Sequence, residues 1–519
     1  SYSDSQRYLA KHRFLQVPHL FATYNTTIAK KHNVGVLVGY NQEYCKSWWF
    51  NARKAGLISL STPVLTAASD LQSSDGGKDD YAMRSYFGRI NYDYAGKYLF
   101  EANVRMDGSS RFAPGNRWGT FSSFSAAWRI SEEAFWEDLK PIVDNLKIRA
   151  SWGRLGNNGI GNYDWQNVYS PANTSFGDAI QQGVWTTAIA NRDISWEKTD
   201  VVDLGLDVNL FGSLSLTFDY YNKLTHGILY RNPIPYVNGG LGAPMINSAK
   251  VRNRGFEFSA FYNKNFGDLG FAVSVNGAYN RNEIIDYKGD YLEIKGATVW
   301  TEGQPIGKFY MREIDHIVQD KAEIDKLVSE GWTFSPSRPE PGDFLYKDLN
   351  NDKRIDDKDR VLKGQPLPLF TFGGSIAFSY KNFDLSALFS GVSGWDRYLS
   401  TGIFSLTNAD TERLFLKKFQ NQWSETNRNT NIPKLYASNE KNNQVSDYYL
   451  YDASFLRLKT LQLGYTLPKN LIPKVRIRAY CNLENYFTIT SYPGMDPEMN
   501  GDVGYPILKT VSLGVNIKF

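Results

Sequence analysis

Apolar and polar residues alternate along much of this chain, and the C-terminal segment shows the pattern most clearly. Val511, Leu513, Val515, Ile517 and Phe519 fall on one side of an extended backbone, whereas the residues between them are polar or glycine. A period of two residues is typical of a β-strand that has one apolar and one polar face. The alternation therefore predicts a strand at the boundary between an apolar and a polar environment.

The same alternation recurs in about 15 segments, which include residues 146–152, 202–208, 214–220, 271–279 and 475–483. Each predicted strand has about ten or more residues, as tilted membrane-spanning strands need, whereas strands of soluble proteins average about 5–6 residues. The polar faces carry Arg, Asp, Glu and Asn, so they are expected to face water. The predicted fold class is all-β, a transmembrane antiparallel β-barrel. A soluble β-sandwich is the alternative, but its strands would be shorter.

The predicted connections alternate in length. Short links are expected at residues 29–33, 95–97, 211–213, 266–268 and 381–382. Long links are expected at residues 49–80, 157–195, 227–248, 285–366, 397–450 and 489–507, of which 285–366 is the largest. Outer-membrane barrels have short periplasmic turns and long extracellular loops. The long links are therefore predicted to face outward.

The number of predicted strands is odd. The first strand, residues 12–28, and the last, which ends at Phe519, would both run towards the periplasm. Bacterial barrels of this kind are antiparallel with an even number of strands, and an open edge would leave unpaired backbone groups in lipid. We therefore expect residues 1–519 to be the C-terminal portion of a larger barrel, with an odd number of further strands before Ser1.

Composition agrees with a membrane barrel. Aromatic residues make up 15% of the 519 residues, which suits the aromatic girdles of such barrels. No segment approaches the roughly 20 apolar residues of a spanning helix, and the first residues do not resemble a signal peptide. The net charge is +4 with no polybasic tract, so nucleic acid is not an expected partner. Cys45 and Cys481 are expected to be unpaired thiols, with a single disulfide as the alternative.

The sequence contains no catalytic constellation. The five histidines show no paired metal-ligand spacing, and they are His12, His19, His32, His226 and His316. The stretch Ser151–Gly156, SWGRLG, is not a nucleophile elbow, because no strand-turn-helix unit surrounds it. The protein is therefore not expected to be an enzyme.

Aromatic residues in the loops could contact a ligand. Trp395, Asp396 and Arg397 follow one another, which joins a stacking face to two charged groups that can form hydrogen bonds. We predict these three residues as substrate contacts. The alternative is that they pack the loop, as most loop aromatics do.

Residues 348–359, DLNNDKRIDDKD, have the spacing of a calcium-binding loop. In the register of an EF-hand, the ligands are Asp348, Asn350, Asp352, the carbonyl of Arg354, Asp356 and Asp359. Two positions depart from that pattern, since Lys353 stands where glycine is usual and Asp359 is shorter than the usual glutamate. Ca²⁺ is the only cofactor that the sequence predicts. The alternative is a solvated acidic turn capped by its own Asp and Asn side chains.

Several segments resemble the SusC/RagA family of TonB-dependent outer-membrane transporters from Bacteroidetes-type bacteria. They include residues 85–133, which begin SYFGRINYDYAGKYLFEANVRMDGSSRFAPGNRWG, and also GDFLYKDLNNDKRIDDKDR, SFLRLKTLQLGYTLP and NLENYFTITSYPGMDPE. The similarity covers most of residues 81–519 and is weaker over the first 80 residues. Together the motifs are specific, although each alone is a generic strand.

The resemblance implies a 22-stranded barrel in the outer membrane of a Gram-negative bacterium. It implies an N-terminal plug and a TonB box, neither of which is found in residues 1–519, and coupling to TonB through that missing part. It also implies a SusD-like surface lipoprotein as partner and a dimer of SusC–SusD-like pairs, surrounded by membrane lipid. The substrate would be an oligosaccharide, with an oligopeptide as the alternative. A passive porin-like channel and a surface adhesin are the alternatives from other classes.

Overall fold

Sixteen of the strands form one large sheet in the computed structural model, which describes residues 5–61, 63–177, 179–231, 234–287, 293–400, 404–406, 416–436, 441–468, 470–472, 474–499 and 504–519. The sheet has 16 strands in the order β1-β3-β4-β5-β6-β7-β10-β11-β12-β13-β22-β23-β26-β27-β28, with β2 also beside β3. Neighbours pair antiparallel, as β3 and β4 do and as β26 and β27 do. The predicted all-β antiparallel fold is therefore confirmed.

The strands of this sheet are β1 (Gln6–Gln16), β2 (His19–Ile28), β3 (His32–Leu57), β4 (Ala68–Tyr94), β5 (Tyr98–Ser109), β6 (Trp118–Arg129), β7 (Val143–Asn157), β10 (Glu197–Leu210), β11 (Leu214–Arg231), β12 (Met245–Phe266), β13 (Leu269–Tyr287), β22 (Phe370–Tyr380), β23 (Phe383–Ser393), β26 (Phe455–Thr466), β27 (Arg476–Thr490) and β28 (Thr510–Lys518). Because β1 and β2 share one position beside β3, the 16 strands occupy 15 positions, as the sequence predicts. Pro18 lies in the break between β1 and β2, where it cannot donate to the ladder.

Shorter elements occupy the connections. The strands are β8 (Tyr169–Phe176), β9 (Ala179–Thr186), β14 (Glu293–Lys295), β15 (Thr298–Trp300), β16 (Lys308–Arg312), β17 (Ile314–Ile317), β18 (Thr333–Phe334), β19 (Phe344–Tyr346), β20 (Arg354–Ile355), β21 (Arg360–Lys363), β24 (Asp396–Tyr398) and β25 (Leu450–Asp452), and the helix is α1 (Lys321–Ser329). The short 3₁₀ helices are Leu65–Ala67, Ile130–Glu132, Ala134–Leu139, Tyr236–Asn238, Asp357–Asp359, Lys417–Asn421 and Asp447–Tyr449. In the described part of the chain, no helix has the length and apolar character needed to cross a bilayer.

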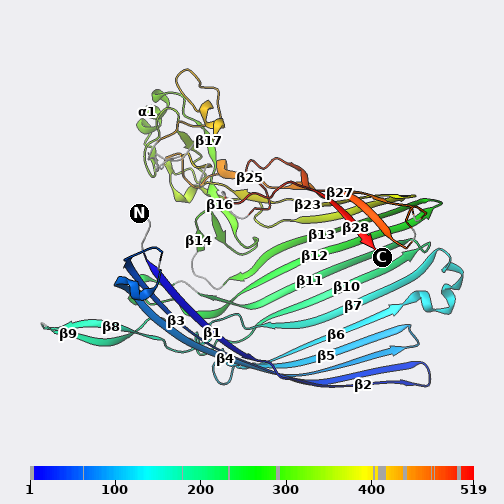
Figure 1. Cartoon of the computed structure of the whole chain (residues 1–519). Coiled ribbons are helices and arrows are strands. Elements are labelled where there is room, and N and C mark those ends of the chain that lie inside the picture. The colour runs from blue at the N-terminus through cyan, green and yellow to red at the C-terminus, as the bar shows by residue number, and fades with distance from the viewer. Residues whose placement is uncertain are drawn as a thin grey trace. The chain divides into compact units, whose positions relative to one another are not determined.

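The chain divides into two units, which we describe separately. The first contains Ser1–Ala134, Lys147–Leu204 and Lys223–Lys250. In it, β1, β3 and β4 run side by side, and the hairpin β8–β9 extends beyond the strands of the sheet (Figure 1). This unit has a small hydrophobic core. Its buried members are Phe112, Phe121, Ile160, Ile194 and Trp196.

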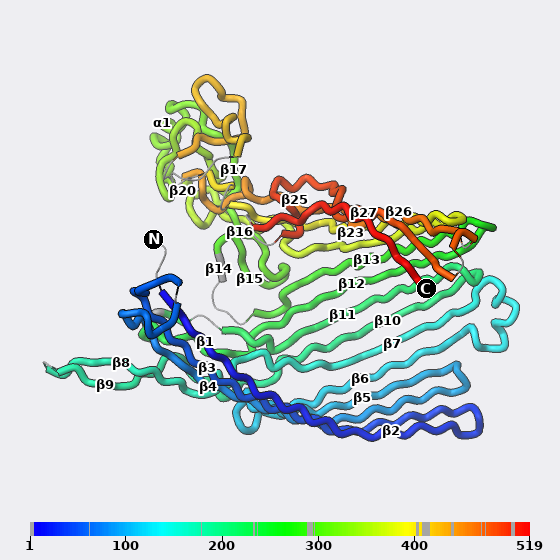
Figure 2. The backbone as a smooth tube through the Cα atoms, in the orientation of Figure 1, coloured from blue at the N-terminus to red at the C-terminus, as the bar shows by residue number. Residues whose placement is uncertain are grey.

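The second unit contains Phe135–Leu146, Gly205–Asn222 and Val251–Phe519. The segment that carries α1, β17 and β20 gathers into a lobe clear of strands β22 to β28 (Figure 2). The lobe has its own core of Ile317, Val318, Ile324, Phe344, Leu345, Tyr346, Ile355, Leu406, Phe419, Trp423, Ile432 and Tyr449. Much of the predicted longest link, residues 285–366, therefore folds into this lobe.

The two faces of each long strand differ in chemistry. In β7, Ile148 and Ala150 lie on the same face, whereas Lys147, Arg149 and Ser151 lie on the other. The apolar face stays exposed, as it does at Ile90, Val104, Phe124, Ile148 and Leu204. An exposed apolar face with a polar face behind it is the arrangement of strands that separate lipid from a water-filled lumen. Cys45 and Cys481 are both free thiols, which confirms that expectation.

Candidate functional site

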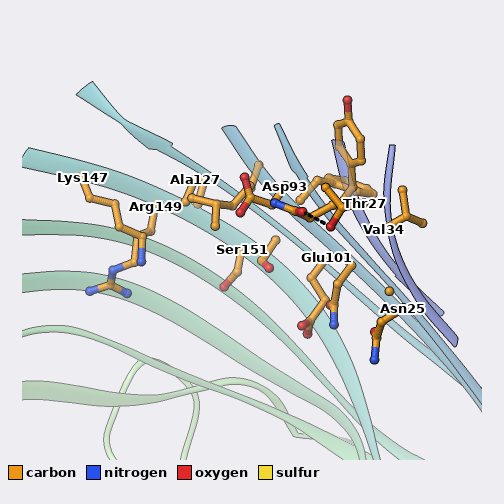
Figure 3. Close-up of a pocket in the computed structure, with 18 of the residues that line it drawn as sticks. Asn25, Thr27, Val34, Asp93, Glu101, Ala127, Lys147, Arg149 and Ser151 are labelled. Atoms are coloured by element: carbon orange, nitrogen blue, oxygen red, sulfur yellow. Dashed lines mark hydrogen bonds between the residues drawn. The ribbon is translucent and has the colours of Figure 1, made fainter. Parts of the chain in front are cut away.

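A recess of about 860 Å³ lies on the polar face of the first unit. Figure 3 shows 18 of the residues that line it, and the lining comes from β2, β3, β4, β5, β6, β7 and β10. The polar members are Asn25, Thr26, Thr27, Asn33, Asn91, Asp93, Glu101, Ser125, Lys147, Arg149, Ser151 and Asp203. Most of these residues alternate along their strands, as Asn91 and Asp93 do, because alternate residues of a strand share a face.

The recess mixes neutral hydrogen-bonding groups with charges of both signs. Thr27 Oγ1 donates to Asn33 Oδ1 at 2.7 Å, and Asn103 Nδ2 donates to Glu101 Oε1 at 2.7 Å. The Arg149 guanidinium lies 3.9 Å from the Asp203 carboxylate. Such a wall can form hydrogen bonds with a hydrated polar solute or with a polar protein surface. Most of its members were not singled out by sequence reasoning, although the alternation placed Lys147, Arg149 and Ser151 together.

The predicted substrate contacts Trp395, Asp396 and Arg397 all have protein partners. Trp395 Nε1 donates to the carbonyl of Pro366 at 3.2 Å. Arg397 Nη1 donates to the carbonyls of Pro497 and Met499 at 3.0 and 2.5 Å. The geometry favours loop packing, which was the alternative, because ligand contact would compete with these bonds. Ligand contact at these residues stays a prediction.

Asp396 ties this segment to a second connection. Its Oδ2 accepts from the backbone N–H of Gln365 at 2.7 Å, and its backbone N–H donates to the Gln365 carbonyl at 2.8 Å. Burial raises the pKa of Asp396 above its ordinary value, and the charge of Asp452 adds to the rise. The Asp396 side chain therefore holds the start of β24 against the segment that contains Gln365.

The loop of residues 348–359 folds around its own carboxylates. Asp348 Oδ1 and Oδ2 accept from the backbone N–H groups of Asn351 and Lys353 at 2.7 and 2.9 Å. Asn351 and Lys353 have φ values of 61° and 63°, so both adopt the left-handed conformation that favours glycine. The sharp turn expected at Lys353 therefore forms without glycine.

The other predicted calcium ligands are also engaged. Asp352 Oδ1 accepts from the N–H of Arg354 at 2.8 Å, and Asp356 Oδ1 accepts from that of Lys358 at 2.8 Å. Asp359 is fully buried and accepts from the N–H groups of Leu349 and Asp356 at 3.0 and 2.9 Å. The Asn350 side chain likewise accepts from the N–H of Asp352, at 2.9 Å.

The side chains of the predicted calcium ligands accept hydrogen bonds from the loop's own backbone. Within the residues that the structure describes, no group of three or more His, Cys, Asp or Glu side chains is placed to hold a metal ion. The observed bonds are those of a self-capped acidic turn, which was the alternative. Calcium binding by the six predicted ligands stays a prediction.

Comparison with known proteins identifies the family. The model of the family described as "TonB dependent receptor-like, beta-barrel" matches residues 1–485. TonB-dependent receptor P3 of Formosa agariphila is 32% identical over 96% of this chain and 52% of that protein. TonB-dependent receptor SusC of Bacteroides thetaiotaomicron is 31% identical over 85% of this chain and 44% of that protein. The chain thus spans about half the length of the curated relatives it matches.

A solved structure gives the same result. The RagAB peptide transporter superposes with a TM-score of 0.85 at 27% identity, over 98% of this chain and 56% of the matched chain. The family consists of transporters and receptors rather than enzymes, which confirms the prediction that this chain is not an enzyme. The predicted resemblance is likewise confirmed. The chain belongs to the TonB-dependent receptor β-barrel family of the bacterial outer membrane and is of the SusC/RagA type.

Proposed function

We propose that this chain forms the C-terminal barrel part of a TonB-dependent transporter that imports a large polar nutrient. The observation that carries the proposal is the recess of about 860 Å³ on the polar face of the first unit. Its amide, hydroxyl and charged groups can replace the hydrogen bonds that a hydrated solute makes with water. The exposed apolar face on the opposite side of the same strands suits lipid.

The partners follow from the family. A SusD-like surface lipoprotein delivers the nutrient, a plug from another part of the transporter occupies the lumen, and TonB supplies the energy through that part. Two SusC–SusD-like pairs associate as a dimer. The similarity to RagAB, whose structures are described as closed-closed and open-open states, supports a mechanism of binding, enclosure and release. No covalent chemistry is required.

We propose an oligosaccharide as the nutrient. The many neutral amide and hydroxyl groups of the recess, such as those of Asn25, Thr27, Asn33 and Ser151, suit the hydroxyl groups of sugars. An oligopeptide is the second candidate, because Lys147, Arg149, Asp93 and Glu101 offer charges that suit peptide termini and because RagAB is described as a peptide transporter. A passive porin-like channel differs from both, since its flux would not depend on TonB.

Uptake by cells that carry the full transporter tests the proposal. We expect growth on an oligosaccharide as sole carbon source, loss of growth when the gene is deleted, and loss of uptake when the membrane potential is dissipated. Growth on oligopeptides alone would select the second candidate, and uptake that persists without the membrane potential would indicate a porin.

A matched pair of variants then tests the recess. Ser151→Trp places a bulky side chain on the polar face, and Ser122→Trp places one on the apolar face of β6. We expect the first to reduce uptake and the second to leave it unchanged, with both proteins present in the outer membrane at equal levels. Equal uptake by the two variants would contradict a transport role for the recess.

A further inference from the structure

Four strands share a pattern on their outward apolar face. In each strand, an arginine lies two residues from an aromatic residue. The arginine is the nearer of the two to the strand end that joins a long connection. The pairs are Tyr86 with Arg84, Trp152 with Arg154, Phe256 with Arg254, and Tyr279 with Arg281. Residues two apart in a strand point to the same face. Because long connections are extracellular, each arginine lies just beyond its aromatic residue on the extracellular side.

The aromatic residues of β11, β12 and β13 in the second unit form a stacked row. The ring centroids of Phe218 and Phe256 lie 6.1 Å apart, and those of Phe256 and Tyr279 lie 5.4 Å apart. Phe218 and Phe256 are 46% and 38% exposed, so the row faces outward. Aromatic rows of this kind lie at the membrane interface, at the level of lipid headgroups. The adjoining arginines are therefore at headgroup height.

Three arginines gather beside this row. Arg252 and Arg254 lie on β12 and Arg281 lies on β13, all on the outward face. Glu283 is the neighbouring acidic residue, with a carboxylate oxygen 4.0 Å from Arg254. Three positive charges and one negative charge leave a local charge of +2. The patch is therefore basic at the level of the lipid headgroups. Contact with lipid alone would not require these charges.

Two polar atoms of this patch lack the partners that burial demands. Arg252 Nε and Asn222 Oδ1 are both buried and have no hydrogen-bond partner among the described residues. A buried polar atom without a partner costs about 1–3 kcal/mol. An anionic ligand that brings acceptor oxygens to the guanidinium groups would balance the charge of the patch.

We propose that the outward face of β12 and β13 binds the phosphate group of an anionic lipid of the outer leaflet, through Arg252, Arg254 and Arg281. Guanidinium groups pair with phosphate through two parallel hydrogen bonds. The row that contains Phe256 and Tyr279 packs the apolar part of the same lipid. The position selects a lipid rather than a free anion, because the arginines border the lipid-facing band.

The other pairs are less suited to the same role. Arg154 Nε and Nη2 donate to the two carboxylate oxygens of Asp200 at 2.7 and 2.9 Å, so its charge is already balanced. Arg84 is exposed but stands without a second arginine on the outward face of its own strand. The proposal therefore concerns the β12–β13 patch.

Lipid selectivity of the intact transporter tests the proposal. The protein is reconstituted in nanodiscs with equal amounts of an anionic and a zwitterionic phospholipid, and the lipids that it retains are counted by native mass spectrometry. We compare the wild type with the triple variant R252Q/R254Q/R281Q. The control K321Q/K326Q/K358Q removes the same charge from exposed lysines of the lobe. Each arginine near an anionic lipid contributes roughly fivefold to binding.

We expect the wild type and the control to retain the anionic lipid preferentially and the triple variant to lose that preference. Equal retention by the triple variant, or no preference in the wild type, would overturn the proposal. Displacement of the lipid by millimolar inorganic phosphate would also count against it, because it would indicate a site for free anions. If the triple variant does not fold, as judged by its gel mobility before heating, the single variant R281Q is used. The result does not depend on which nutrient is transported.

Discussion

Asp359 shows how one buried carboxylate fixes a loop. It accepts hydrogen bonds from the N–H groups of Leu349 and Asp356 and is fully buried. The substitution Asp359→Asn replaces one acceptor oxygen by a donor, which leaves one of these N–H groups unsatisfied. We expect a loss of about 1–3 kcal/mol in local stability. Hydrogen exchange of residues 344–360 measures it, and Glu425→Gln, an exposed carboxylate changed in the same way, is the control. Equal exchange in the two variants would contradict this role.

Titration calorimetry of the intact protein tests calcium binding by the same loop. A saturable heat at millimolar calcium would support the predicted site, because extracellular calcium modules bind in this range. If calcium gives neither heat nor stabilisation, the self-capped turn remains.

His316 lies between two carboxylates of the lobe. Burial lowers its pKa, but hydrogen bonds to Asp315 at 2.8 Å and Glu323 at 2.5 Å outweigh burial and raise the pKa above the ordinary value of 6.5. A raised pKa adds stability that is complete below the unfolded value and is lost as pH rises through the folded value. We expect the protection factors of the α1 amides, which are corrected for base-catalysed exchange, to fall as pH rises from below 6.5 through that raised pKa. His316→Gln should abolish the dependence, and a dependence that persists would assign it to another group.

At the scale of single residues, the sequence predicts which residues of one segment lie close together better than it predicts their hydrogen-bond partners in distant segments. The alternating acidic and amide side chains of residues 348–359 do form one compact loop, as their spacing suggests. The roles of Trp395 and Arg397 could not be predicted, because Arg397 bonds to carbonyls about a hundred residues further along the chain. No local pattern reports a contact of that separation.

At the scale of structural elements, Arg457 of β26 holds the connection that follows β27 in place through ion pairs. Its side chain is 1% exposed and pairs with Asp496 at 2.5 Å and Glu498 at 2.6 Å. Arg457→Met leaves two acidic groups without their buried partner. We expect a loss of about 3–5 kcal/mol, seen as rapid hydrogen exchange and proteolysis at residues 491–499. Lys459→Met removes a half-exposed partner of Glu498 and should cost less than about 1 kcal/mol. Similar losses of stability in both variants would contradict this role of Arg457.

Strands were the elements that the sequence predicted best. Two-residue alternation survives in β7, β10, β11, β13, β27 and β28, because lipid on one face and water on the other impose it on every spanning strand. The lobe was not predicted as a folded unit. Its short strands and α1 are held by a core whose members Ile324, Phe344 and Tyr449 come from distant segments, so no single window shows it.

At the scale of the whole molecule, the sheet has two edges. Among the described residues, β28 pairs only with β27, and β1 and β2 pair only with β3. An edge strand in lipid would leave backbone groups without partners. We expect strands from another part of the same transporter to pair with these edges, as the predicted odd number of strands requires.

Hydrogen exchange of β28 tests this expectation. With the 519-residue chain alone in detergent, the amides of β28 that point away from β27 should exchange rapidly, whereas those of β27, which is paired on both sides, should be protected. Addition of the remaining part of the transporter should protect the exposed amides of β28. If β28 is fully protected in the 519-residue chain, the sheet closes on itself and the need for further strands disappears.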